Sequence, residues 1–192
     1  MKKKTAVSLH IEENIKNYKN IFERCSDIKF QQMQLGKEHD CECFLAYIEV
    51  SINNTLIRNT ALGRMIGFLD ETTKEQRNRL LDENAMGIAD IAWYESMEEA
   101  AQGMLTGDAI LFVDGYGKAI KIADQGYPGM GVSDSESEKV VRGSNEAFTD
   151  SVKVNTALIR KRVRSTRIRV EELNGGVRSH TLINLIYMRD LV

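Results

Sequence analysis

Long hydrophobic runs are missing from this sequence. No uninterrupted apolar stretch reaches the roughly 18 residues that a membrane-spanning helix needs, so we do not expect the chain as given to cross a bilayer. The basic start of the chain meets Glu12 and Glu13 before an apolar segment of adequate length can form. This order of residues argues against a secretory signal peptide.

Cysteine is also scarce, with only Cys25, Cys41 and Cys43. An odd count without a regular spacing favours a reducing, cytosolic environment over a disulfide scaffold. A zinc site would require these thiols and the His39 side chain to lie close together around one ion. Two residues along a strand cover about 6.6 Å, whereas sulfur atoms around tetrahedral zinc lie roughly 3.8 Å apart. We therefore expect small buried thiols and no bound metal.

Proline is nearly absent, and its single occurrence marks a loop. Pro128 lies in the segment 125–138, which is rich in glycine and serine, a composition typical of a loop. Gly126, Gly129 and Gly131 of this loop have neither the lysine of a P-loop nor the spacing of a dinucleotide-binding turn. A nucleotide site is not expected there.

The rest of the composition is that of a folded, water-soluble protein. Hydrophobic residues make up 42% and charged residues 28% of the 192 residues, close to globular averages. The three histidines are scattered, and no serine lies in a nucleophile elbow. These patterns predict neither an enzyme nor a cofactor.

Apolar periodicity predicts alternating helices and strands. Ser96 and Glu99 have the spacing of a capping box at a helix start, and Gly107 suits the helix exit. Expected helices cover 11–24, parts of 53–84, 97–107 and 150–164. Expected strands cover 30–35, 43–52, 87–94, 109–124 as a hairpin, 167–173 and 181–188. The last strand is apolar enough for a sheet interior. We predict an α/β fold of two small, closely packed subdomains with mixed sheets flanked by helices, at 1–92 and 93–192.

Positive charge gathers in one segment of a chain whose formal net charge is only -2: seven Lys or Arg residues and no carboxylate occur between residues 151 and 170. On a helix, Val152, Thr156, Ile159 and Val163 would face inward. The basic residues Lys153, Arg160 and Arg164 would form a separate stripe, and Arg162 would lie near the flank of the apolar face.

Three roles for the basic helix are open: nucleic-acid binding, contact with an acidic protein surface or lipid headgroups, and simple solvation. Aromatic residues are absent from 149 to 184, which disfavours binding to RNA or single strands. The pI near 6.0 disfavours a dedicated nucleic-acid binder. A solvated or partner-facing helix is favoured.

The sequences "VVRG", "EAFTDS" and "NTALIRKR" follow one another in the order and spacing of a family motif. In these and the neighbouring stretches "GDAILFVDGYGKAI" and "RVEELNGGVRSHTLINLIYMRD", the chain resembles the GerA family of spore germination proteins, the A subunits of nutrient germinant receptors. The matched motif positions are Arg142, Gly143, Phe148, Ser151, Asn155, Leu158, Arg160 and Arg162.

This resemblance implies a non-enzymatic soluble region that couples nutrient sensing to receptor assembly and to the opening of an ion pathway. Full-length members continue into a membrane region of the spore inner membrane, absent from this chain, with the soluble region on the cytoplasmic, core side. Implied partners are B and C subunits, further A subunits and a small-molecule nutrient, but no nucleic acid. Direct nutrient binding and nucleic-acid binding by the basic helix are the alternatives. The candidate binding residues are Arg142, Lys153, Asn155, Arg160, Arg162 and Arg164.

Overall fold

Helices and strands alternate along the chain, as expected for an α/β protein. The computed structural model describes residues 4–49, 61–82, 91–122 and 147–191. The helices are α1 (Ile11–Ile21), α2 (Ala61–Asp70), α3 (Lys74–Asp82), α4 (Met97–Leu105) and α5 (Val152–Arg162). The strands are β1 (Ile28–Leu35), β2 (Cys41–Ile48), β3 (Ile91–Tyr94), β4 (Ala109–Val113), β5 (Ala119–Ile122), β6 (Ile168–Gly175) and β7 (Thr181–Met188).

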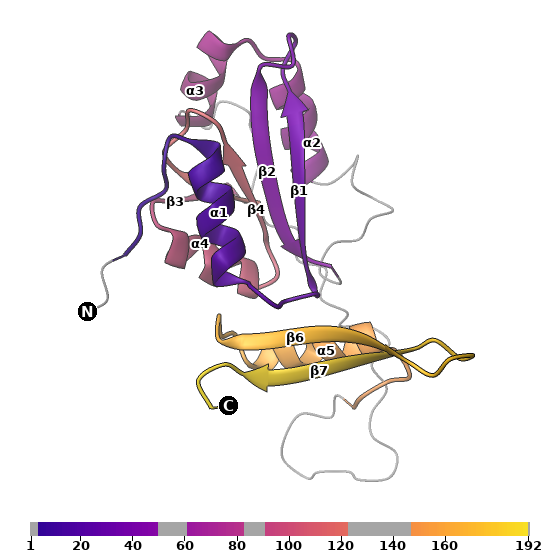
Figure 1. Ribbon diagram of the computed structural model, residues 1–192. Coiled ribbons are helices and arrows are strands. Elements are labelled where there is room, and N and C mark those ends of the chain that lie inside the picture. The colour runs from indigo at the N-terminus through magenta and orange to yellow at the C-terminus, as the bar shows by residue number, and fades with distance from the viewer. Residues whose placement is uncertain (1–3, 50–60, 83–90, 123–146, 192) are drawn as a thin grey trace.

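Five strands form the central sheet of the larger part of the molecule, in the order β1-β2-β4-β5-β3. Neighbouring strands in this sheet are antiparallel. The helices α1 and α4 lie on one face, and α2 and α3 lie against the other (Figure 1). We call these elements the sheet unit. Because helices cover both faces, β2 and β4 are apolar along almost their whole length instead of alternating between apolar and polar residues.

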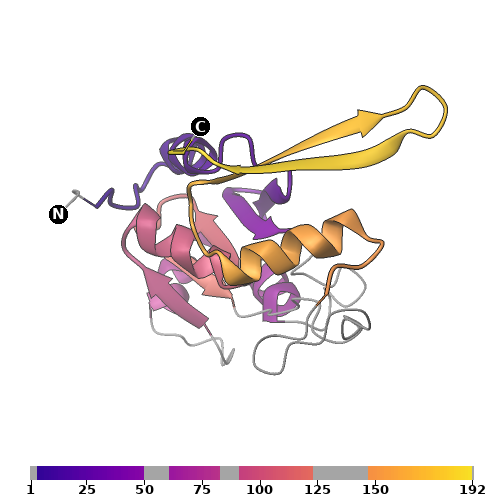
Figure 2. The ribbon, with the colours of Figure 1, turned by 90° about the horizontal axis from the view of Figure 1, so that it is seen from below.

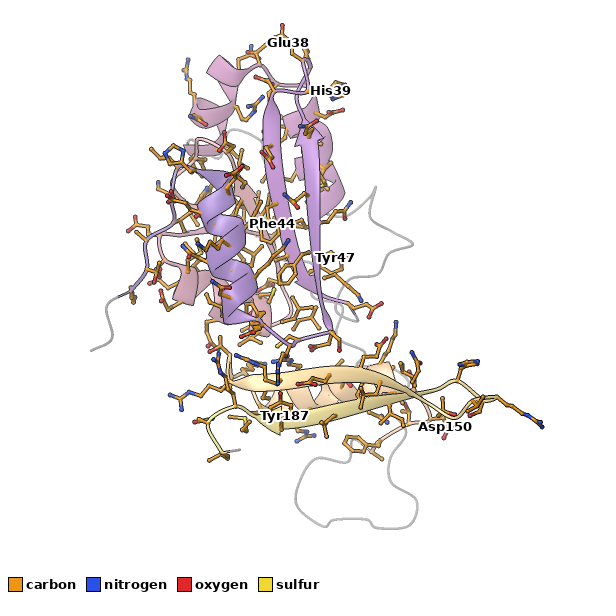
Figure 3. All side chains as sticks on the ribbon, in the orientation of Figure 1. Glu38, His39, Phe44, Tyr47, Asp150 and Tyr187 are labelled. Carbon is orange, nitrogen blue, oxygen red and sulfur yellow. The ribbon has the colours of Figure 1, made fainter. Side chains whose placement is uncertain are left out.

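An aromatic cluster fixes α1 on the sheet. The ring of Tyr18 lies 5.0 Å from Phe112 and 5.3 Å from Phe22, measured between centroids. Phe44 of β2 is directly opposite Phe112 of β4 in the strand register and stacks on Phe30 (Figure 3). Burial in this apolar layer raises the pKa of Tyr18 well above its ordinary value, so the phenol stays neutral.

The predicted start and turn signals of the middle segment are confirmed. The Ser96 side chain accepts a hydrogen bond from the Glu99 N–H and caps α4. Gly107 and Gly115 both have positive φ, at the exit of α4 and in the β4–β5 turn respectively. These are positions where a side chain would strain the backbone.

The smaller part of the molecule consists of α5 and the antiparallel hairpin β6–β7, which we call the hairpin unit. The hairpin crosses the end of the sheet unit, and its outer part extends past both α5 and the sheet unit (Figures 1 and 2). One face packs on α5, where Asn184 donates a hydrogen bond of 2.9 Å to the Thr156 hydroxyl. Among the described strands β7 pairs only with β6, so the expectation that it lies inside a sheet is wrong.

The observed sheets group the elements differently from the division expected after residue 92. That position falls inside β3, and the central sheet combines β1 and β2 with β4 and β5. The pairing of β2 with β4 explains this grouping, because each apolar strand covers an edge of the other and both faces are buried.

Phe44→Ala should lower the free energy of unfolding by about 3–5 kcal/mol, since it removes a fully buried ring from the aromatic cluster. Urea denaturation followed by circular dichroism measures this loss. Gln32→Ala, at the exposed position paired with Phe44 on β1, is the matched control and should change stability by less than about 0.5 kcal/mol. Equal effects of the two substitutions would contradict this account of the core.

Candidate functional site at the junction of the two units

The basic helix α5 meets the sheet unit through a buried ion pair. Arg160 and Asp27 form two parallel hydrogen bonds, from Nε to Oδ2 at 2.8 Å and from Nη2 to Oδ1 at 3.0 Å. Both side chains are buried, and Arg160 is completely inaccessible. Burial opposes the charge of Arg160, but the Asp27 carboxylate outweighs this penalty and raises the pKa of the guanidinium. The guanidinium of Arg160 therefore stays charged at neutral pH.

This ion pair sets the rotation of α5. The helix buries Thr156, Ala157, Leu158 and Arg160, and Ser151 caps its first turn. Val163, which we expected to face inward, is 43% exposed, and Val152 and Ile159 are only partly buried. Of the predicted inward face only Thr156 is buried, because Arg160 turns inward to reach a carboxylate that apolar periodicity cannot detect.

Lys153 also reaches an acid of the sheet unit. Its Nζ lies 2.9 Å from Oε1 of Glu49, whose other oxygen is 3.5 Å from Nζ of Lys29. Burial alone would raise the pKa of Glu49, but the two lysines together lower it. Of the predicted stripe of Lys153, Arg160 and Arg164, the first two therefore face carboxylates of the neighbouring unit, Glu49 and Asp27.

The other candidate residues lie apart from these contacts. Asn155 closes the turn before α5, because its side chain accepts a hydrogen bond from Thr149 N–H and donates one to Thr149 O, both at 2.7 Å. Arg162 and Arg164 are exposed, and Arg164 donates to the Lys161 carbonyl. Arg142 lies outside the described residues. The structure brings together Lys153 and Arg160 but not Asn155, Arg162 or Arg164.

Backbone hydrogen bonds attach the hairpin to the segment that follows α1. Val170 N–H donates to Arg24 O at 3.0 Å, and Ser26 N–H donates to Val170 O at 2.9 Å. At the next residue of the strand, Glu171 accepts hydrogen bonds from Tyr187 at 2.5 Å and from Arg24 at 3.4 Å. Sequence reasoning missed Asp27, Arg24 and Glu171, since a charged residue whose partner lies far away in the sequence carries no periodic signal.

The three cysteines do not gather at one site. Cys25 lies at the junction and contacts the Ile168 carbonyl, whereas Cys41 and Cys43 are buried on β2. His39 is exposed at the far end of the β1–β2 turn (Figure 3). The Sγ atoms of Cys41 and Cys43 are 3.5 Å apart, so the expected separation of 6.6 Å along the strand was wrong for the side-chain tips. Their hydrogen bond and burial hold the pKa of Cys43 well above its ordinary value.

Comparison with known proteins decides the family. The family model described as Bacillus/Clostridium GerA spore germination protein matches residues 16–192. The chain belongs to the GerA family of spore germination proteins. Within the described residues of this GerA-family chain, no helix combines the length and apolar character that a bilayer crossing requires.

Relatives of this GerA-family chain are considerably longer than it is. It is 31% identical over 185 residues to the uncharacterized membrane protein YfkQ of Bacillus subtilis, a match that covers 96% of the chain and 35% of YfkQ. It is 20% identical to spore germination protein KA of the same organism, covering 96% of the chain and 34% of the relative. The chain thus spans about a third of the length of these relatives.

A crystal structure shares the fold of the chain. This structure is the N-terminal domain of the A subunit of the Bacillus megaterium spore germinant receptor GerK3. The two superpose with a TM-score of 0.70 at 18% identity, over 97% of the chain and 68% of the crystallised domain. The likeness confirms the α/β fold predicted from the sequence, although both sheets of the described residues are antiparallel and not mixed as expected.

Asp27→Ala should destabilise the chain by about 3–5 kcal/mol, because it leaves the Arg160 guanidinium buried without a carboxylate. The double variant Asp27→Leu, Arg160→Met should recover most of this loss, since an apolar pair requires no desolvation of charge. Chemical denaturation of both variants tests the prediction. A double variant as unstable as the single one would show that the stability depends on the ionic contact itself.

The stability that Glu49 contributes should depend on pH. Its pKa is below the ordinary 4.5 in the folded chain, so its contribution is complete above 4.5 and decreases as the pH falls through that value and the lower folded pKa. Glu49→Gln should therefore flatten this part of the curve of unfolding free energy against pH. Glu38→Gln, at an exposed position in the β1–β2 turn (Figure 3), is the control and should keep the wild-type slope.

Proposed function

We propose that this GerA-family chain is the soluble, non-enzymatic region of a spore germinant receptor A subunit, which couples nutrient sensing to receptor assembly and to ion-pathway opening during germination. Family membership and the fold shared with the N-terminal domain of an A subunit support this proposal. The observation that carries it is the junction, where basic side chains of α5 hold two units together through Asp27 and Glu49.

The two contacts suit coupling because they differ in strength and exposure. The Arg160–Asp27 pair is buried, and breaking one partner of such a pair is costly. The Lys153–Glu49 pair is partly exposed, with side-chain accessibilities of 47% and 26%, so it contributes much less and can break and re-form. A buried pivot beside an exchangeable contact lets a small force on the hairpin unit change its orientation on the sheet unit.

In this proposal the partners are the B and C subunits of the receptor and further copies of the A subunit. The full-length protein lies in the spore inner membrane, and the present region is soluble on the cytoplasmic, core side. A nutrient signal that changes the contact between subunits then acts on the membrane region through the hairpin unit.

A charge swap in the full-length protein tests the coupling role. Lys153→Glu and Glu49→Lys each place like charges together at the junction, so each alone should slow nutrient-induced germination. The double swap restores opposite charges and should return the rate toward the wild-type value. Germination is measured in spores as release of dipicolinate, alongside receptor abundance by immunoblot.

The control substitution is Arg178→Glu, which changes a charge at the exposed end of the hairpin, away from the junction. It should leave the nutrient response unchanged if coupling depends on the junction contact. Normal germination by both single variants at wild-type abundance would refute coupling through this contact.

A further inference from the structure

A cavity lies at the seam between the two units, and its lining does not include Arg160 or Asp27. It measures about 680 Å³ and is bounded by the end of α1, one side of α4 and the base of the hairpin. Figure 1 shows α1 and α4 directly above this part of the hairpin. The volume lies within the range of about 300–1,000 Å³ that small-molecule sites occupy. Polar side chains in the lining include Asn20, Gln102 and Thr166.

Three arginines of the lining come from the base of the hairpin, namely Arg167, Arg169 and Arg189. Arg167 and Arg169 share a side of their strand because side chains alternate with period two. Arg189 N–H donates to Arg167 O at 2.9 Å, which sets the two strands in register at this end. The register therefore concentrates positive charge at the cavity.

Arg169 is the decisive residue of this cluster. Its side chain is only 3% exposed, and its hydrogen bonds within the described part of the chain go to the carbonyl oxygens of Thr166 and Ile168, at 2.8 and 3.1 Å. Carbonyl oxygens hold the guanidinium in place but do not neutralise it. A buried cation without a carboxylate partner is costly, and an anion in the adjoining cavity would lower that cost.

The acids of the lining already have partners. Arg167 pairs with Asp190 and lowers the pKa of that carboxyl group. Glu98 accepts hydrogen bonds from Thr5 N–H at 2.9 Å and from the Thr5 hydroxyl at 3.2 Å. Arg189 makes no side-chain hydrogen bond or ion pair to any residue in the described ranges. Two guanidinium groups, those of Arg169 and Arg189, thus remain available to an anion.

We infer that this cavity binds a small molecule through an oxyanion, either a carboxylate or a phosphate group, held by Arg169 and Arg189. Guanidinium groups donate paired hydrogen bonds to both kinds of oxyanion. The side chains of Gln102 and Asn20 supply donors and acceptors for the remainder of the ligand. Because α1 and α4 belong to the sheet unit, the bound molecule joins the two units. This inference does not depend on the proposed receptor role.

Titration of the chain with inorganic phosphate and with succinate, against sodium chloride at equal ionic strength, tests the site. Backbone amide shifts of Gln102 and Thr166 report binding at the cavity. We expect saturable shifts with at least one of the two anions and none with chloride. Saturation with phosphate alone identifies the ligand group as a phosphate, and saturation with succinate alone identifies it as a carboxylate. Saturation with both anions shows that the site recognises the oxyanion chemistry that the two groups share.

Two variants distinguish the site from general attraction of anions. Arg189→Gln removes one donor at an exposed position and should weaken binding about tenfold or more without unfolding the chain. Arg178→Gln removes the same charge from the exposed end of the hairpin and should leave the affinity unchanged. No saturation with either anion, or equal weakening by both variants, would overturn the inference.

Discussion

The buried ion pair between Arg160 and Asp27 is the contact on which the arrangement of the two units depends. A guanidinium removed from water needs a carboxylate in a fixed geometry, so α5 has one rotation that satisfies it. Once that rotation is set, Lys153 lies beside Glu49, and the hairpin lies along residues 24–26. The position of the hairpin unit thus follows from one directional contact more than from its limited apolar surface.

The parts of the fold that the sequence predicted are those whose causes are local. The cap of α4 requires a serine and a backbone N–H three residues apart, and the β4–β5 turn requires a glycine with positive φ. Apolar periodicity predicted the α/β architecture, which the shared fold confirms. Each of these features can be recognised from a few neighbouring residues or from an ordered motif.

The parts that the sequence did not predict depend on partners far away in the chain. The sequence places Arg160 on a basic stripe that can face a partner, but it does not identify that partner, because Asp27 lies 133 positions earlier. Two of the cavity arginines, Arg167 and Arg169, lie in the same basic segment, yet only the structure shows that Arg169 is buried while Arg167 is paired. Likewise, distance along a strand describes backbone positions, whereas the side chains of Cys41 and Cys43 lean together.

The length of the hairpin gives its two ends different roles. Both strands have eight residues, and only the base of the hairpin rests on the sheet unit (Figure 2). There the face away from α5 carries arginines and Glu171, while further out the same face exposes Leu173, Ile183 and Leu185, each about half accessible. The outer end therefore presents apolar surface, whereas the cavity and the junction contacts lie at the base.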